Sequence, residues 1–336
     1  MYERDRIKAV QYGSGPIGLT VVRFASECPE IELVGAIDIT NVGCELGEMA
    51  GLQKRLGVFI SNDPDAVLSK SKPDIVFHNT SSSLKDVYPQ IEKCIKAGAN
   101  VISSTEELSY PFKKQFDLAN AIDNLARQFQ VTVLGTGVNP GYLMDSWPLF
   151  MTGICRSVDR IRINRIQDAS ERRISFQKKI GAGCTLEEFQ KLARAGAVRH
   201  VGLEESIGMI ADGLGWELER ITEDLGPIVA DAEVWSDFLT VKKGHAAGVK
   251  QVGHGFMKGE EVITLDFQAY IGAKESYDAV YITGIPDLEV TIKGGAQGDI
   301  ATGAIIINSI HRVIEAPPGL MTMKDLPIIT ARRHVV

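Results

Sequence analysis

Cysteine is scarce in this 336-residue chain, and the pattern of the few that occur excludes two classes of site. The five cysteines are scattered, odd in number and form no CxxC pair. That usage is typical of reduced thiols in the cytoplasm, and it argues against a disulfide framework or a zinc site. The six histidines lack the HxH or HxxxH spacing of metal ligands, so we expect no metal site.

Positive charge and long apolar runs are also in short supply. Lys and Arg number 36 against 43 Asp and Glu, and no long basic run occurs, which argues against a nucleic-acid partner. No apolar stretch approaches the ~20 residues of a membrane-spanning helix. The first eight residues are too charged to resemble a signal peptide. We therefore expect a cytoplasmic protein that contacts no membrane, with a length that suits two domains.

What the chain does contain is a glycine-rich motif, Gly13–Gly18 (GSGPIG), in a suggestive setting. The strand-like run Ile7–Gln11 precedes it, a helical pattern follows, and Asp38 ends the next apolar run. This context is the one that a dinucleotide-binding unit requires. Gly13 would permit the tight turn, Gly15 would let the backbone approach a pyrophosphate, and the last glycine would let helix and strand pack closely. The phosphates would then lie on the helix N-terminus.

The first ~140 residues alternate strand-like and helix-like segments, which predicts an α/β fold with a Rossmann-type, doubly wound parallel sheet. The carboxyl ends of parallel strands meet at one edge of the sheet, where ligands bind. Small or polar loops follow these strands: Gly13–Gly18, Asp38, Asn79–Ser83, Thr105–Glu107 and Gly135–Gly141. Their convergence predicts a cofactor and substrate cleft.

Asp38 bears on the choice of cofactor, because a carboxylate at that position accepts hydrogen bonds from the adenosine ribose. No Arg or Lys follows it to receive a 2′-phosphate, so NAD is favoured, while NADP stays open. The residues that we expect to bind the cofactor are Gly13, Ser14, Gly15, Pro16, Ile17, Gly18, Asp38, Asn79, Thr80, Ser81, Ser104 and Asn139.

Glu106 and Glu107 follow a strand at this edge and have two interpretations. Acidic residues favourably meet the dipole at the start of a helix, and Tyr110-Pro111 looks like such a start. Alternatively, a carboxylate in an apolar, cofactor-lined pocket suits general acid/base catalysis. Neighbours on an extended segment point in opposite directions, so at most one of the two should face the nicotinamide. The residues alone leave open which one.

The pattern changes after residue 142 and predicts a second, α+β domain of mostly antiparallel strands. Val158–Ala169 alternates apolar and polar residues, and Val249–Met257 with Val262–Ile271 reads as a hairpin. We expect a dinucleotide-binding domain over 1–142 and a substrate-binding domain over 143–299, with 300–336 packing back on the first. Four cations are either a solvated face or part of a substrate-binding loop: Arg172, Arg173, Lys178 and Lys179.

Several stretches resemble the 2,4-diaminopentanoate dehydrogenase family and its relatives, the native NAD(P)-dependent amine dehydrogenases, on a dihydrodipicolinate reductase-like fold. They are Ser104–Pro111, Gly135–Gly141, Gln167–Ser170, Gly298–Thr302 and Ala316–Leu320. The resemblance implies an oxidoreductase that deaminates an amine to a ketone with release of ammonia, or runs the reverse. It also implies that Glu106 is the catalytic carboxylate, that Asn139 and Thr302 lie near substrate or nicotinamide, and that the second domain forms a homodimer.

One departure separates the chain from true dihydrodipicolinate reductases. Those enzymes carry a paired-histidine motif ahead of a lysine and a glycine-containing loop. Here Lys179–Gly183 resembles the loop, but Arg172, Arg173 and Gln177 precede it. Two alternatives stay open: a dihydrodipicolinate reductase-like or homoserine dehydrogenase-like oxidoreductase acting on a carboxylated imine or carbonyl, and a non-enzymatic NAD-binding sensor.

Overall fold

The computed structural model describes residues 6–331, which separate into two compact units. The first unit comprises residues 1–142 and 297–336, and the second comprises 143–296. The charged segment Met1–Asp5, on which the signal-peptide expectation partly rests, and His334 lie outside the described residues. Within the described part of the chain, no helix is long and apolar enough to cross a membrane. Those same residues contain no cluster of three or more metal-ligating side chains.

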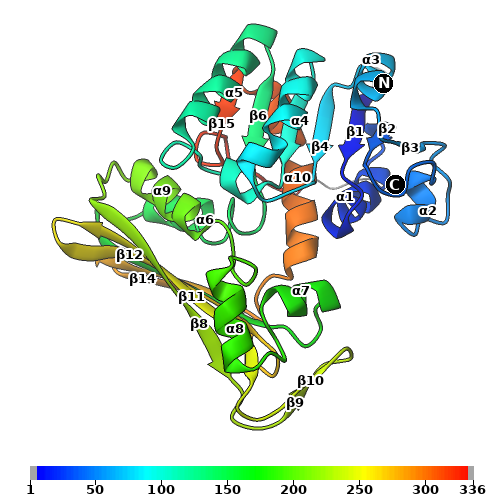
Figure 1. Cartoon of the computed structure of the whole chain (residues 1–336). Helices are drawn as coiled ribbons and strands as arrows, with labels where there is room; N and C mark the ends of the chain where they lie inside the picture. Colours follow the sequence, from blue (N-terminus) through cyan, green and yellow to red (C-terminus); the bar gives the residue numbers. More distant parts are fainter. Residues whose placement is uncertain (1–5, 332–336) are drawn as a thin grey trace. The chain divides into compact units, whose positions relative to one another are not determined.

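The first unit is built on a seven-stranded parallel sheet (Figure 1). Its strand order is β15-β6-β5-β4-β1-β2-β3, so the order of connection reverses between β1 and β4. That reversal is the switch point at which ligands bind in doubly wound sheets. The strands are β1 (Ile7–Tyr12), β2 (Ile31–Ile37), β3 (Ile60–Ser61), β4 (Ile75–His78), β5 (Asn100–Ser103), β6 (Thr132–Gly135) and β15 (Gly319–Met321).

Helices cover both faces of this sheet. Two of them, α1 and α10, pack on each other over one face, and α4 and α5 pack together over the other (Figure 1). Apolar residues on α4 and α5 meet those of the central strands in a fully buried core. The helices are α1 (Pro16–Ser26), α2 (Leu46–Met49), α3 (Pro64–Ser71), α4 (Leu84–Lys96), the 3-10 turn η1 (Glu106–Leu108), α5 (Phe116–Phe129) and α10 (Gly298–Glu315).

Two local predictions in the first unit are wrong. The expected helix start at Tyr110-Pro111 is not used, since α5 begins at Phe116. Glu106 and Glu107 do not lie on an extended segment but form the start of η1, so the argument from alternating directions does not apply to them. The short strand β15 was not expected either; it pairs with the edge of β6.

The second unit contains a six-stranded sheet with the order β14-β13-β7-β12-β11-β8. All neighbours in it are antiparallel except β7 and β12, which confirms the mostly antiparallel second domain. The predicted hairpin joins β11 to β12 through Lys258 and Gly259, both at positive φ. Its strands are β7 (Ser157–Asp168), β8 (Arg220–Val229), β11 (Ala246–Met257), β12 (Glu260–Tyr270), β13 (Tyr277–Ile285) and β14 (Leu288–Lys293), with the small pair β9 (Val234–Trp235) and β10 (Thr240–Val241).

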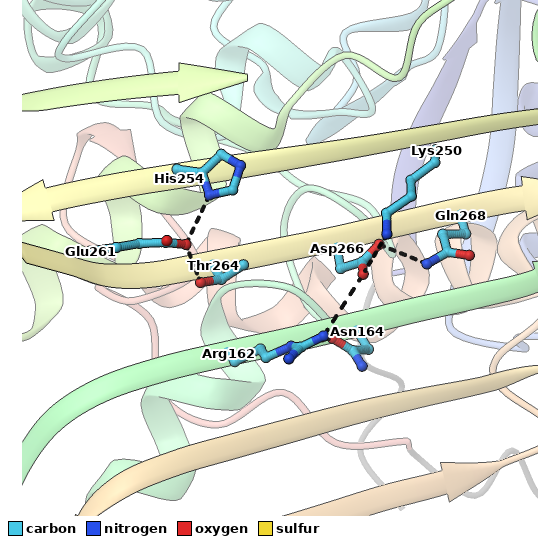
Figure 2. A network of polar contacts seen from close by, with 8 residues as sticks. All are labelled: Arg162, Asn164, Lys250, His254, Glu261, Thr264, Asp266 and Gln268. Atoms are coloured by element: carbon cyan, nitrogen blue, oxygen red, sulfur yellow. Dashed lines mark hydrogen bonds and ion pairs between the residues drawn. The ribbon is translucent and has the colours of Figure 1, made fainter. Parts of the chain in front are cut away.

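The two faces of the six-stranded sheet differ sharply in chemistry. One face forms the apolar core of the unit with α6 (Ser146–Thr152), α7 (Ile174–Lys179), α8 (Leu186–Arg194) and α9 (Leu203–Gly213). The other face carries the polar network of Figure 2. There Asp266 lies 3.6 Å from Lys250 and 4.0 Å from Arg162, while Glu261 accepts a hydrogen bond from His254 at 2.8 Å.

Candidate active site

The glycine-rich loop fits a dinucleotide for reasons that differ from glycine to glycine. Gly13 has a φ of +98°, and a Cβ there would lie 2.2 Å from the carbonyl oxygen of Asn79. A Cβ on Gly18 would lie 2.0 Å from the carbonyl oxygen of Gly13. A Cβ on Gly15, in contrast, would meet nothing within 4 Å. The first and last glycines are therefore demanded by the packing of the chain itself, whereas Gly15 leaves space at the start of α1 for a ligand to approach the backbone.

The start of α1 is also suited to an anion. Pro16 occupies the first turn, and Gly15 provides no side-chain cap for the amides that follow. Amides of a first helical turn have no acceptor within the helix, and the helix dipole favours negative charge there. The loop thus offers a pyrophosphate both the space and the donors that it needs.

Asp38 is fixed beside this loop by four hydrogen bonds. The backbone N–H and hydroxyl of Ser14 donate to one carboxylate oxygen, and those of Thr40 donate to the other. Partial burial by itself would raise the pKa of Asp38, but these hydrogen bonds outweigh it and hold the pKa below its usual range. The carboxylate stays ionised and preoriented at the end of β2, where a ribose diol would be recognised.

Three further polar residues meet at the switch point between β1 and β4. The Gln11 side-chain amide donates to the Gly13 carbonyl at 2.8 Å and to Asn79 Oδ1 at 2.9 Å, and the Asn79 amide donates to Ser104 Oγ at 2.9 Å. The structure thus brings together the predicted residues Asn79 and Ser104. Sequence reasoning missed Gln11, although a polar residue in an apolar strand just ahead of the motif was a usable signal.

His78 ties the ends of β4 and β5 together. Its Nδ1 lies 2.9 Å from Ser103 Oγ, and its Nε2 lies 2.8 Å from Gln90 Oε1. Burial lowers the pKa of His78 to about 4, so the ring is neutral at physiological pH. Two predicted cofactor residues join this network: the Thr80 hydroxyl donates to Gln90, and the Ser81 carbonyl accepts from the Thr105 hydroxyl.

The adjacent glutamates differ in what they contact. The Glu107 carboxylate accepts hydrogen bonds from the backbone N–H of Leu84 at 2.8 Å and from the Gln115 amide at 3.3 Å. It therefore serves the first turn of α4. Glu106 begins η1 with a partly buried side chain, and its carbonyl accepts a hydrogen bond from the Ser109 hydroxyl.

The loop after β6 is held by α10. Thr302 Oγ1 accepts a hydrogen bond from the backbone N–H of Val138 at 3.2 Å, and both groups are buried. Asn139 is the next residue of this loop and is also buried. The segment Gly298–Thr302 thus positions the loop 135–141 within the same unit.

The four cations Arg172, Arg173, Lys178 and Lys179, which are close in sequence, have different environments in the second unit. Arg172 is buried, with its guanidinium 4.2 Å from the centre of the Phe176 ring, and Arg173 donates to Ser175. Both lysines lie exposed on α7. Sequence reasoning missed Arg165, a buried arginine on β7 that is paired with Asp278.

Comparison with known proteins shows to which family the chain belongs. A family model of the 2,4-diaminopentanoate dehydrogenase C-terminal domain matches residues 142–335, and one of the dihydrodipicolinate reductase N-terminus matches 7–128. The chain is 34% identical over 333 residues to a 2,4-diaminopentanoate dehydrogenase of Acetoanaerobium sticklandii, covering 96% of this chain and 94% of that one. The chain belongs to the 2,4-diaminopentanoate dehydrogenase family. This confirms the resemblance inferred from the motifs.

Two further similarities extend over nearly the whole chain of this family member. It is 25% identical to an amine dehydrogenase of Streptomyces virginiae, over 96% of both chains. Its fold matches the structure of an amine dehydrogenase from Mycobacterium smegmatis with a TM-score of 0.86, at 24% identity and over 99% of both chains. The expected fold class and the oxidoreductase class are therefore confirmed.

Proposed function

We propose that this member of the family oxidatively deaminates an amino compound such as 2,4-diaminopentanoate to a ketone and ammonia, or carries out the reverse reductive amination. The observation that carries the proposal is the combination of whole-chain similarity to a 2,4-diaminopentanoate dehydrogenase with a first unit shaped for a dinucleotide. When bound, a nicotinamide dinucleotide supplies the hydride acceptor or donor.

NAD is the cofactor that the residues favour. The open space at Gly15 and the uncapped start of α1 suit the pyrophosphate, and the ionised Asp38 suits the two ribose hydroxyls. A 2′-phosphate would meet the negative charge of that carboxylate, which disfavours NADP. Asn79, Thr80, Ser81, Ser104 and Asn139 would complete the cofactor site.

Glu106 is proposed as the catalytic carboxylate. An ammonium group has a pKa several units above 7 and cannot release a hydride until it loses a proton. Glu106 would hold the ammonium, accept that proton, and later move protons as water adds to the iminium carbon and ammonia leaves. The Glu107 carboxylate accepts hydrogen bonds from Leu84 and Gln115. The assignment of Glu106 is supported by its place in the stretch Ser104–Pro111, which resembles the family. Asn139 and Thr302 would lie near the reacting groups.

A homodimer through the second unit is part of the proposal. The sheet face opposite the helices carries acids and bases that alternate across β7, β11 and β12, so a second copy could meet it with complementary charge (Figure 2). Val252 lies in this face, opposite Asp266. Val252→Arg should yield monomers in light scattering, whereas Ile39→Arg, at an exposed site of the first unit, should leave the dimer intact.

The decisive experiment is NADH and NADPH oxidation by the purified protein with 2-amino-4-oxopentanoate and small ketones, with and without concentrated ammonium. Turnover that requires ammonium would establish reductive amination. Turnover without ammonium would instead indicate a carbonyl or imine reductase. Cofactor binding with no turnover on any substrate of the panel would favour the sensor and contradict the proposal.

Glu106→Gln should retain cofactor affinity and lose about 10²–10⁴-fold in kcat, which is the usual share of a general acid/base. Glu107→Gln is the matched control, since its side-chain oxygen still accepts from Leu84, and its turnover should stay within a few-fold of the parent protein. A fully active Glu106→Gln variant would remove this residue from the mechanism.

A further inference from the structure

Gln11 is a fully buried polar residue on β1, the strand that leads into the glycine-rich loop. A buried amide costs free energy unless hydrogen bonds compensate for the lost water. Its Nε2 donates two of them, to the Gly13 carbonyl at 2.8 Å and to Asn79 Oδ1 at 2.9 Å. Its Oε1 has no hydrogen-bond partner in the described part of the chain. The two bonds donated by Nε2 therefore orient this side chain.

The direction of this amide follows from the chemistry of its partners. A carbonyl oxygen only accepts hydrogen bonds, so the group that faces Gly13 must be the NH2 group of the amide. The last glycine of the motif leaves room for it, because a Cβ on Gly18 would lie 2.8 Å from Nε2. The same NH2 group faces Asn79, which must therefore present its oxygen on that side. The orientation of one side-chain amide thus fixes the orientation of the next.

This series of hydrogen bonds ends at the Ser104 hydroxyl. The NH2 group of Asn79 donates to Ser104 Oγ at 2.9 Å, so the hydroxyl is an acceptor toward Asn79. A hydroxyl also carries one proton to donate. Ser104 donates it to no protein group among residues 6–331, and its side chain is half-buried. The hydroxyl is therefore oriented as a donor for a ligand that carries an oxygen acceptor.

The strand order indicates which part of a dinucleotide would meet this hydroxyl. Asp38 follows β2 on one side of β1, whereas Ser104 follows β5, two strands from β1 on the other side. With the pyrophosphate at the start of α1 and the adenosine ribose at Asp38, the nicotinamide half would extend over β4 and β5. The ribose hydroxyls and the carboxamide carbonyl of that half are oxygen acceptors.

We propose that Gln11 is a positioning residue of the cofactor site. Through Asn79, it orients the Ser104 hydroxyl as a hydrogen-bond donor to an oxygen of the nicotinamide half of the dinucleotide. This role rests on the proposed function, because that function requires the cofactor. It adds a residue that acts only through its neighbours, and it assigns one direction to the hydrogen bond of Ser104.

Titration of the purified protein with NADH and with ADP, in the absence of amine and ketone, tests this role. ADP has the adenosine and two phosphates but lacks the nicotinamide half. Ser104→Ala should weaken NADH binding about 3–10-fold, the usual effect of one hydrogen bond, and should leave the affinity for ADP unchanged. Ser104→Thr keeps the hydroxyl and should retain the parental affinity. Gln11→Met keeps a similar volume without a donor and should weaken NADH binding by a similar factor.

Asn79→Asp gives the sharper test because it reverses the direction of the last hydrogen bond. A carboxylate still accepts from Gln11 but cannot donate to Ser104, so the hydroxyl would donate to the carboxylate instead. In this background Ser104→Ala should change the Kd for NADH by less than about twofold. The comparison of the two backgrounds cancels the effect of the added charge itself. An equal loss from Ser104→Ala in both backgrounds would overturn the inference.

Gln251→Met is the matched control for Gln11→Met. Gln251 is a fully buried glutamine of the second unit that forms three hydrogen bonds. Its replacement should lower the free energy of unfolding in urea while the Kd for NADH keeps its parental value. If Gln11→Met likewise loses stability and keeps the parental Kd, Gln11 is only structural and the inference fails.

If Gln11→Met does not fold, the comparison of Ser104→Ala in the parent and in Asn79→Asp decides the question. A parent protein that binds NADH without ammonium-dependent turnover would count against the proposed function and leave this test intact. A parent protein that binds neither NADH nor NADPH would overturn the inference together with the cofactor site.

Discussion

His78 in the first unit and His200 in the second are both neutral imidazoles held at low pKa, yet their surroundings differ. Ser103 and Gln90 contact both ring nitrogens of His78, and the network continues to Thr80. His200 is fixed by ring stacking and by its backbone, while its Nε2 has no hydrogen-bond partner among the described residues.

The two rings therefore affect stability differently. A buried ring whose nitrogens both have protein partners, such as His78, stabilises the chain. A buried nitrogen without a protein partner, such as His200 Nε2, lowers stability unless water or a ligand supplies a partner. The glycine loop shows the same division, since Gly13 is closed off by Asn79 while the space beside Gly15 is open.

The largest expected effect on stability comes from comparing alanine substitutions at Gly13, where no space is available, and at Gly15, where the space is open. Gly13→Ala combines a positive φ with a Cβ placed 2.2 Å from a backbone oxygen, so it should lower the free energy of unfolding by about 3–5 kcal/mol. Gly15→Ala should change it by less than about 0.5 kcal/mol and instead weaken dinucleotide binding. Urea unfolding and cofactor titration measure the two quantities. Normal cofactor affinity in Gly15→Ala would show that the open space is not used.

The loss of stability at acidic pH should depend on both histidines. The pKa of His78 is lowered to about 4 and that of His200 to about 3, against 6.5 in an unfolded chain. The unfolded state therefore binds protons first as the pH falls below 6.5, and the free energy of unfolding should drop by up to about 1.4 kcal/mol per pH unit for each histidine until its folded pKa is reached. Urea unfolding between pH 7 and 4 would measure this slope.

A smaller effect on stability is expected at Thr302, whose hydroxyl oxygen accepts a hydrogen bond from the buried Val138 N–H. Thr302→Val removes the acceptor of the buried Val138 N–H and should lower the free energy of unfolding by about 1–2 kcal/mol. Thr302→Ser keeps the oxygen and should stay closer to the parent. If both variants are equally stable but raise the KM for the amine, Thr302 acts on the substrate and not on the loop.

The smallest expected effect concerns the cofactor preference. Asp38→Asn keeps an oxygen acceptor but loses the negative charge, so the ratio of kcat/KM for NADH to that for NADPH should fall by about tenfold. Stability should fall slightly, since Ser14 and Thr40 would then donate to a neutral or rotated amide. An unchanged ratio would mean that the Asp38 carboxylate does not contact the adenosine ribose of the cofactor.

The sequence predicted the first sheet well because its signals are local. The strand-like run Ile7–Gln11 ends one residue short of the observed β1, and the glycine motif, Asp38 and Asn79 follow strand ends in register along one edge. Even the wrong helix start after Glu107 has a local cause. Pro111 resembles a first-turn proline, but it lies between the 3-10 turn η1, which ends at Leu108, and the start of α5 at Phe116.

The second unit was less predictable because the places of its buried polar residues depend on pairings between distant strands. Arg165 reads as a solvated charge in an alternating strand, and only the register with Asp278 and Phe267 shows that it lies in the core. Arg199 and His200 follow α8 in a segment without periodicity, and Gln251, which fixes His200, is 51 residues away. No spacing rule joins such positions.

The first unit is completed only by the last part of the chain, because β6 lies at the edge of its sheet until β15 pairs with it. A ribosome must therefore synthesise all of the second unit before α10 and β15 can close the first. During that interval the Val138 amide lacks the Thr302 hydroxyl, and one side of β6 is exposed to other strands. In the order of synthesis, α10 and β15 are thus the last elements that the first unit receives, and a chain released before residue 319 would lack the strand that covers this edge.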